Sequence, residues 1–210
     1  MFIAVDGIDG SGKSTLVKGL AEALAPFHPL TTKEPTDASP WGRRLRASAK
    51  AGRLPRATEI EYFHKDRLHH IETVIQPALD RGQIVITDRY FDSTLAFQAR
   101  SPEEAEVLYQ SYLGKDVLRP DLTLILRCPV ARGLQRLHRR DAGCLSAFED
   151  AEAQVRAKEI YESRSGAHYR FLDASGAEQD VLRQALTALK KHCQSRPDLH
   201  DYVEKFLLRR

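Results

Sequence analysis

The chain has 210 residues with 32 basic and 29 acidic side chains, so its formal net charge at pH 7 is only +3. A charge this small, carried by dispersed basic residues, predicts no nucleic-acid partner. No apolar run approaches the roughly 18 residues of a membrane-spanning helix, so we expect no membrane partner. Three cysteines without C-x-x-C spacing favour free thiols over disulfides or a zinc site, and we expect a cytoplasmic protein.

An apolar run at residues 2–5 leads directly into the pattern G-x-x-x-x-G-K-S. Leucines at positions 16, 20 and 24 then follow the spacing of one helix face, so the pattern lies between a predicted strand and a predicted helix. This context is typical of a phosphate-binding loop. The residues of this loop are Gly7, Ile8, Asp9, Gly10, Ser11, Gly12, Lys13, Ser14 and Thr15.

The chemistry of the loop follows from its place before a helix. Glycines let the backbone turn its N–H groups inward, and the positive end of the helix dipole attracts phosphates. Lys13 is suited to neutralise the outer phosphates of a nucleotide, and the hydroxyl of Ser14 is suited to ligate magnesium.

Strand-like and helix-like segments alternate along the rest of the chain. We expect further strands at residues 29–32, 84–87, 122–126 and 169–172. Helices are expected at residues 58–79 and 101–113, and from about residues 130, 148 and 178. Pro77 should bend the first of these helices near its end.

Strands that alternate with helices of ten residues or more imply right-handed parallel crossovers. We therefore predict an α/β fold with a doubly wound, five-stranded parallel sheet covered by helices on both faces. Ligands of such folds bind beyond the carboxyl ends of the strands. Glu34, Asp88, Arg89 and Arg127 follow predicted strand ends, as the glycine-rich loop does, so four loops should meet over one crevice.

With these pieces in place, the chain resembles the thymidylate kinase family, whose members are P-loop nucleoside monophosphate kinases. The matching segments are the loop, Lys-Glu-Pro at 33–35, Phe63 and Arg67, Asp-Arg-Tyr-Phe-Asp-Ser-Thr-Leu-Ala-Phe-Gln at 88–98, and Arg-Pro-Asp-Leu-Thr at 119–123. The resemblance implies a transferase of nucleotide biosynthesis that phosphorylates dTMP to dTDP, on the way to dTTP. It also implies ATP as co-substrate bound at the loop, Mg²⁺ as cofactor, and a homodimer.

The resemblance assigns five residues to the nucleoside of dTMP. Phe63 matches an aromatic residue that stacks on the thymine ring. Arg67 lies one helical turn later on the same face and can reach the same base edge. Gln98 and Thr94 match polar contacts to the pyrimidine, and Phe97 stands beside the deoxyribose where many members have tyrosine.

Further residues are assigned to the phosphates and the metal ion. Arg89 and Arg46 match arginines that hold the monophosphate or the transferring phosphoryl group, although Arg46 also lies in a basic run that could equally be a solvated helix face. Asp88 is expected near the magnesium ion together with Ser14, acting through bound water. Asp9 is expected to face the acceptor's sugar, and Glu34 to help arrange metal and acceptor.

Two departures from the family pattern concern charge. Arg127 stands where many members have aspartate after the fourth strand. The loop carries no arginine, and members of that kind supply lid arginines, one of which is replaced here by Ala147. The arginines left as candidate catalytic residues, each of them equally an exposed helix charge, are Arg136, Arg139 and Arg140.

We divide the chain into a kinase domain at residues 1–195, with a lid at about 136–149, and an extension at 196–210. Apolar side chains of the extension fall on one helical face, which predicts an amphipathic helix docked on its own domain or across a dimer. Two other functions stay open. One is a kinase for another nucleoside monophosphate or a deoxynucleoside, and the other is a nucleotide-binding regulatory protein with reduced catalysis, suggested by the altered lid.

Overall fold

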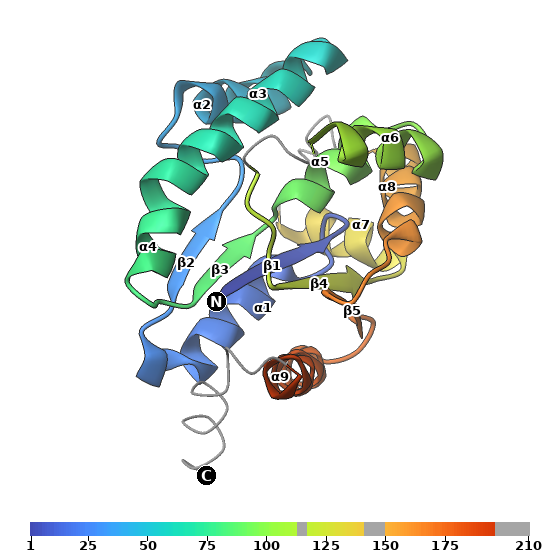
Figure 1. The fold of residues 1–210 in the computed structure, drawn as a ribbon. Helices are drawn as coiled ribbons and strands as arrows, with labels where there is room; N and C mark the ends of the chain where they lie inside the picture. Colours follow the sequence, from blue (N-terminus) through green and yellow to red (C-terminus); the bar gives the residue numbers. More distant parts are fainter. Residues whose placement is uncertain (113–116, 141–149, 196–210) are drawn as a thin grey trace.

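The computed structural model describes residues 1–112, 117–140 and 150–195, where strands and helices alternate (Figure 1). The strands are β1 (Phe2–Gly7), β2 (Leu30–Lys33), β3 (Val85–Asp88), β4 (Leu122–Arg127) and β5 (Tyr169–Asp173). The helices are α1 (Lys13–Ala23), α2 (Pro40–Ala51), α3 (Arg56–His70), α4 (Gln76–Asp80), α5 (Phe91–Gln98), α6 (Pro102–Tyr112), α7 (Val130–Arg140), α8 (Ala151–Ser163) and α9 (Glu178–Gln194). None of these described helices combines the length and apolarity that a membrane crossing requires.

The five strands form one parallel sheet, as predicted. Their order in the sheet is β2-β3-β1-β4-β5. Parallel pairing brings the carboxyl ends of the strands to one edge of the sheet, where the polar loops follow. Backbone hydrogen bonds continue past the strand ends. The N–H of Arg89 donates to the carbonyl of Val5 at 2.9 Å, and that of Glu34 donates to the carbonyl of Asp88 at 3.1 Å.

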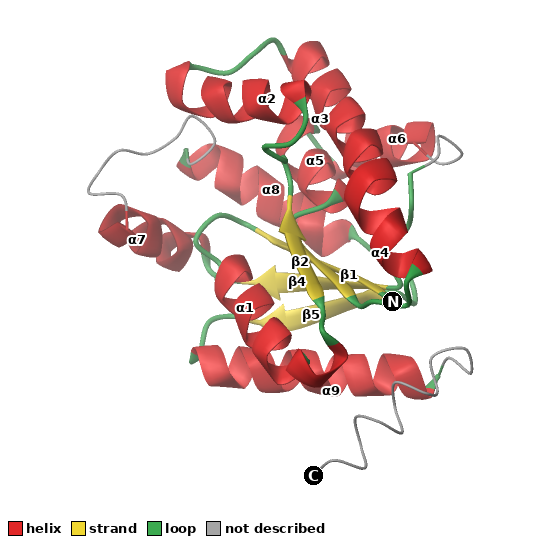
Figure 2. Cartoon of the chain, turned by 90° about the vertical axis from the view of Figure 1, so that its left-hand side faces the viewer, coloured by secondary structure: helices red, strands yellow, loops and turns green. Residues whose placement is uncertain are grey.

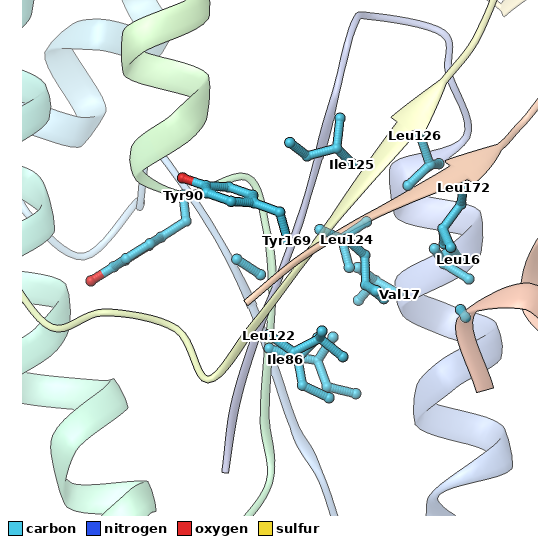
Figure 3. Packing of buried hydrophobic residues seen from close by; sticks show 14 of the residues in the cluster. Leu16, Val17, Ile86, Tyr90, Leu122, Leu124, Ile125, Leu126, Tyr169 and Leu172 are labelled. Atoms are coloured by element: carbon cyan, nitrogen blue, oxygen red, sulfur yellow. The ribbon is translucent and has the colours of Figure 1, made fainter. Parts of the chain in front are cut away.

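Helices cover both faces of the sheet, with α1 and α9 on one face and α3, α5 and α8 on the other (Figure 2). The central strands β1, β3 and β4 are buried from both sides, and the close view in Figure 3 places Leu16 and Val17 of α1 on one side of the sheet and Tyr90 on the other. This burial explains the nearly continuous apolar runs of β1 and β4. The sheet therefore acts as a rigid base for the loops at its edge.

Two helices were absent from the sequence prediction. Helix α5 has only eight residues and is buried on nearly every side, so it lacks the periodic pattern of an amphipathic helix. Helix α2 is strongly basic, but a local signal for it exists. Ser39 caps it by accepting a hydrogen bond from the N–H of Gly42 at 2.8 Å, and Pro40 occupies the first helical position.

The long helix expected at residues 58–79 is confirmed with one modification. Helix α3 passes into a π-helical turn over Ile71–Ile75, which leads into the short α4. Pro77, in the first turn of α4, has no N–H to donate to the preceding turn. The wider turn is one of the recognised ways in which a helix absorbs such an interruption.

Some predicted features fall outside the described residues. Helix α8, expected from about residue 148, begins at Ala151. The segment 141–149, which includes Ala147, and the segment 196–210 are not described. The lid sequence, the C-terminal extension and the domain limit at residue 195 therefore stay predictions.

Asp66 on α3 binds the loop after β2 through hydrogen bonds. Its buried carboxylate accepts hydrogen bonds from the N–H of Thr36 at 2.8 Å, from the Thr36 hydroxyl at 2.6 Å and from the Ser39 hydroxyl at 2.5 Å. A Cβ atom on Gly42 would lie 2.5 Å from the same carboxylate, so α2 packs closely here. One acidic side chain thus positions the loop and the start of α2.

We predict that Asp66→Ala lowers the free energy of unfolding by about 2–4 kcal/mol, because it leaves several buried donors without an acceptor. Urea denaturation followed by circular dichroism measures this loss. The matched control is Asp80→Ala, which removes an exposed carboxylate from α4 and should change stability by less than about 0.5 kcal/mol. Equal effects of the two substitutions would contradict the structural role of Asp66.

Candidate active site

The glycine-rich loop is held closely against α7. Gly10 has a φ of 71°, and a Cβ atom built on it would lie 2.1 Å from the carbonyl oxygen of Gly133. A side chain at either glycine would push the loop and the helix apart, because Gly133 in turn approaches the carbonyl of Asp9. The loop backbone is therefore fixed between β1, the start of α1 and α7.

Lys13 is the buried cation of the loop. Its ammonium group donates to the carbonyl oxygens of Gly7 at 3.0 Å and Ile8 at 2.8 Å. Burial, helped by the nearby charge of Arg89, lowers the pKa of Lys13 to about 8, although the charge of Asp9 opposes this shift. An anionic ligand at the loop would restore the favourable surroundings that burial removes.

Ser14 and Asp88 lie side by side at the edge of the sheet, where the Ser14 hydroxyl donates to a carboxylate oxygen of Asp88. Both residues line a cavity of about 610 Å³ along β2. A hydroxyl and a carboxylate are hard oxygen ligands of the kind that Mg²⁺ prefers. This pair of donors fits the predicted metal site.

Arg89 adopts a left-handed backbone conformation with φ of 69°, which typically costs a non-glycine residue about 1–3 kcal/mol. The surrounding structure enforces it. The Arg89 N–H is bonded to Val5, and its carbonyl accepts from the buried Thr87 hydroxyl at 2.8 Å. The side chain pairs with the Asp9 carboxylate, which raises the pKa of Arg89 against the effect of burial, so the guanidinium stays charged.

Asp9 is oriented from a distant part of the chain. Its N–H donates to Oε1 of Gln154 at 2.9 Å, and Nε2 of Gln154 donates to its carboxylate at 2.9 Å. Burial works to raise the pKa of Asp9, but the charges of Arg89 and Lys13 outweigh it and lower the pKa. The contact of Gln154 with Asp9 was not predicted from the sequence, because Gln154 lies 145 residues away on α8 and belongs to no local motif.

A second cavity, of about 850 Å³, lies over the glycine-rich loop. Residues from the loop, α1, α7 and the start of α9 line it. Sequence analysis missed the contribution of Ala174, Gly176 and Glu178, which lie after β5. Their position beyond the carboxyl end of a strand was the available signal. We call this cavity the loop cavity.

Of the two predicted lid arginines whose side chains are described, Arg136 reaches the loop and Arg139 does not. The NH1 group of Arg136 donates to the carbonyl oxygens of Gly10 at 3.3 Å and Ser11 at 3.5 Å, and Arg136 lines the loop cavity. Arg139 on the same helix is exposed. Arg140 ends α7, and its side chain is not among those described.

A second group of predicted residues gathers around Arg67, which is fully buried. Its Nε and NH2 groups donate to one carboxylate oxygen of Glu34 at 3.0 and 2.8 Å, and NH2 also donates to the Thr94 hydroxyl at 2.9 Å. His70 lies 3.1 Å from the other Glu34 oxygen. The NH1 group of Arg67 has no hydrogen-bond partner among the described residues. A buried donor of this kind calls for an acceptor from a ligand.

Phe63 and Gln98 complete the wall beside Arg67. Phe63 precedes Arg67 by one helical turn on α3 and is partly exposed. Gln98 follows Thr94 by one turn on α5 and is buried. Its Nε2 donates to Glu59 at 3.0 Å, and its Oε1 accepts from Arg53 at 3.4 Å.

The buried Glu59 was missed in the sequence, because a glutamate on a predicted helix is normally exposed. Glu59 and Arg53 also contact each other at 2.5 Å, so they fix the orientation of the Gln98 amide together. The amide of Gln98 is therefore held by protein side chains in this structure, and its contact with a pyrimidine stays a prediction.

Three further predicted residues are held by local contacts. Arg46 pairs with Asp37 at 2.9 Å and donates to the Pro35 carbonyl, beside the Glu34 loop. Phe97 lies under Arg89, whose guanidinium carbon is 5.4 Å from the ring centre. The guanidinium of Arg127 lies over the Phe171 ring at 4.2 Å, and Arg127 is not among the residues that line the loop cavity.

Comparison with known proteins agrees with this geometry. A family model described as Thymidylate kinase matches residues 5–185. A thymidylate kinase from Xanthomonas campestris pv. campestris (strain B100) is 39% identical over 187 residues, covering 88% of this chain and 81% of the relative. One from Xylella fastidiosa (strain 9a5c) is 37% identical over 188 residues, covering 89% and 88%.

The lowered pKa of Lys13 predicts how the affinity for a nucleoside triphosphate depends on pH. A lysine that must be protonated in the complex gives an affinity that is constant below its free pKa, here about 8, and falls towards tenfold per pH unit above it. Calorimetric titration with ATP between pH 6.5 and 9.5 measures this. Lys13→Met should bind weakly, stay folded and lose the decline, whereas a wild-type affinity that is constant to pH 9.5 would contradict the assignment.

Proposed function

The chain belongs to the thymidylate kinase family, and we propose that it transfers the γ-phosphoryl group of ATP to dTMP, giving ADP and dTDP. The observation that carries this proposal is a site with two parts along one sheet edge. One part is the loop cavity with Lys13 and Arg136. The other is the Arg67 cluster, which offers an unpartnered buried donor beside a partly exposed aromatic ring.

The loop cavity is suited to the triphosphate. Lys13 and Arg136 both donate to neutral backbone carbonyls, which phosphate oxygens can replace as acceptors. The Asp9 carboxylate lies 3.9 Å from the Lys13 ammonium group, beyond hydrogen-bonding distance. The start of α1 adds backbone N–H groups and the positive end of its dipole. The residues after β5 extend the cavity and provide room for the rest of the donor nucleotide.

The Arg67 cluster is suited to the base of the acceptor. A thymine ring stacked on Phe63 would bring a carbonyl oxygen within reach of the NH1 group of Arg67. Thr94 and Gln98 lie on the same wall, on α5. Because Glu34 neutralises Arg67, this end of the site favours an uncharged ring over a phosphate.

In the reaction, an oxygen of the acceptor's phosphate attacks the γ-phosphorus, the bond from that phosphorus to the β–γ bridging oxygen breaks, and ADP leaves with the electron pair. Most of the protein's contribution is positioning and charge stabilisation. Lys13 and Arg136 would hold the donor phosphates, and Arg89 would hold the acceptor phosphate or the transferring group. Asp9, which pairs with Arg89, would also face the acceptor's sugar, as the family resemblance implies.

We propose Mg²⁺ as the cofactor, held by Ser14 and through water by Asp88, because these two oxygen ligands lie together at the loop. When bound, the ion would neutralise charge on the β- and γ-phosphates. A cytoplasmic location fits the three cysteines of the chain, which lack the spacing of a disulfide framework or a zinc site. The proposed homodimer rests on the family resemblance, and light scattering after gel filtration tests it.

The direct test of the function is ADP release from ATP and magnesium across a panel of nucleoside monophosphates. We expect dTMP to give the highest kcat/KM, with dTDP as product. A higher value with another monophosphate would move the protein to a different specificity. Binding without turnover for every member of the panel would favour a regulatory role.

We predict that Arg67→Ala raises the KM for dTMP about 10- to 100-fold, because a hydrogen bond from a buried charged donor is lost. The KM for ATP should change less than about threefold. Gln98→Ala should act in the same direction. The control is Lys65→Ala, an exposed residue of the same helix that pairs with Glu61 and lies over the Trp41 ring, which should alter neither constant. Equal effects of Arg67→Ala on both substrates would refute the placement.

We also predict that Arg136→Ala lowers kcat at least about 100-fold, because an arginine at the transferring group stabilises the spreading charge of the transition state. The KM for dTMP should hardly change. Arg139→Ala, on the exposed side of the same helix, should retain most of the activity. Steady-state kinetics of both variants decides between them, and full activity of Arg136→Ala would show that the lid charge comes from elsewhere.

A further inference from the structure

A buried hydrogen-bond network lies behind Arg89. The NH1 group of Arg89 donates to the hydroxyl of Ser93 at 3.2 Å. Ser93 in turn donates to Oδ1 of Asp6 at 2.5 Å. The hydroxyl of Tyr161 lies 2.9 Å from the Ser93 hydroxyl and donates to the same Asp6 oxygen at 3.4 Å. The three residues come from α5, β1 and α8, so the network joins three elements beneath one arginine.

Asp6, behind Ser93 in this network, is a buried carboxylate close to Arg89. Asp6 is fully buried in β1, and its second carboxylate oxygen has no hydrogen-bond partner among the described residues. Burial raises the pKa of Asp6 overall, although the hydrogen bond from Ser93 and the charge of Arg89 oppose this shift. A buried carboxylate needs hydrogen-bond donors and a cation close by, which Ser93 and Arg89 supply.

Ser93 and Asp9 contact different nitrogen atoms of the Arg89 guanidinium. Asp9 pairs with NH2, whereas Ser93 accepts a hydrogen bond from NH1. Phosphate oxygens that bind Arg89 will compete with Asp9 for the guanidinium. The bond to Ser93 keeps the plane of the guanidinium fixed during that exchange, so the arginine need not reorient when substrate binds.

Tyr161 supports the same guanidinium from a second direction. Its ring meets the ring of Phe97 nearly edge-on, with centroids 6.5 Å apart and an interplanar angle of 81°. Phe97 is the ring over which the Arg89 guanidinium lies. Tyr161 therefore contacts both the polar and the aromatic support of Arg89, and it does so from α8, the helix that follows the predicted lid.

We propose that Ser93, with Asp6 and Tyr161 behind it, is a positioning residue that holds the Arg89 guanidinium in its phosphate-binding orientation. This inference rests on the proposed function, because it assumes that Arg89 binds the acceptor phosphate or the transferring group. It goes beyond that function by assigning roles to three residues that touch neither substrate. Their effect must pass entirely through Arg89.

The test is steady-state kinetics of Ser93→Ala, Ser93→Thr and Tyr161→Phe with dTMP and ATP. We expect Ser93→Ala to lower kcat about 10- to 100-fold and to leave the KM for ATP within about twofold. Ser93→Thr keeps the hydroxyl and should recover most of the loss. Tyr161→Phe removes one oxygen atom from a packed ring and should lower kcat several-fold. The control Ser163→Ala removes a hydroxyl of α8 that bonds only within its helix, and should change nothing.

A second arm shows whether the effect passes through Arg89. In an Arg89→Lys background, Ser93→Ala should cause no further loss, because the guanidinium that it positions is absent. Independent, multiplicative losses in the two backgrounds would overturn the inference, as would an unchanged kcat of both Ser93→Ala and Tyr161→Phe. A wild-type enzyme that does not phosphorylate dTMP would instead overturn the proposed function, so the two failures are distinguishable. Thermal unfolding of each variant separates positioning from lost stability.

Discussion

The rest of the site depends on the burial of one positive charge, the ammonium group of Lys13, at the edge of the sheet. Lys13 lies in the first turn of α1, at the positive end of the helix dipole, and Arg89 lies nearby. The fall of its pKa from 10.5 to about 8 corresponds to a free-energy cost on the order of 3 kcal/mol for keeping the ammonium group charged. Carboxylates at the strand ends reduce this cost, and phosphate oxygens would reduce it further. The acidic residues around the loop, Asp6, Asp9 and Asp88, therefore act as counter-charges that stabilise the protonated Lys13.

Sequence alone predicted the parts of the site that local pattern determines. The glycine-rich loop, Glu34, Asp88 and Arg89 lie at or directly after the carboxyl ends of strands, and the parallel sheet brings them together. The helical spacing of Phe63 and Arg67 was likewise visible in the sequence. These inferences needed only the periods of strands and helices and the geometry of a parallel sheet.

Sequence could not reveal the residues that orient those side chains. Gln154 contacts Asp9 across 145 residues, and Tyr161 contacts Asp6 across 155. Neither residue lies in a motif, and on a helix each would normally be assigned to packing or to solvent. Sequence also could not separate Arg136 from Arg139, because both lie in one basic stretch. Only the close contact of Gly10 with Gly133 decides which of them reaches the loop.

The cations of the site differ in their hydrogen-bond partners, and this difference favours one orientation of the acceptor. Lys13 and Arg136 donate to neutral carbonyls, and the Asp9 carboxylate lies 3.9 Å from the Lys13 ammonium group, so a phosphate would add negative charge where the hydrogen-bond acceptors are neutral. Arg67 is already paired with a carboxylate that accepts two of its hydrogen bonds, so a phosphate there would face Glu34 as well. An acceptor with a neutral base at one end and a dianion at the other is stable in one orientation only. The fold thus places the paired Arg67 at one end of the site and the cations that donate to neutral carbonyls at the other, which favours one orientation of the substrate.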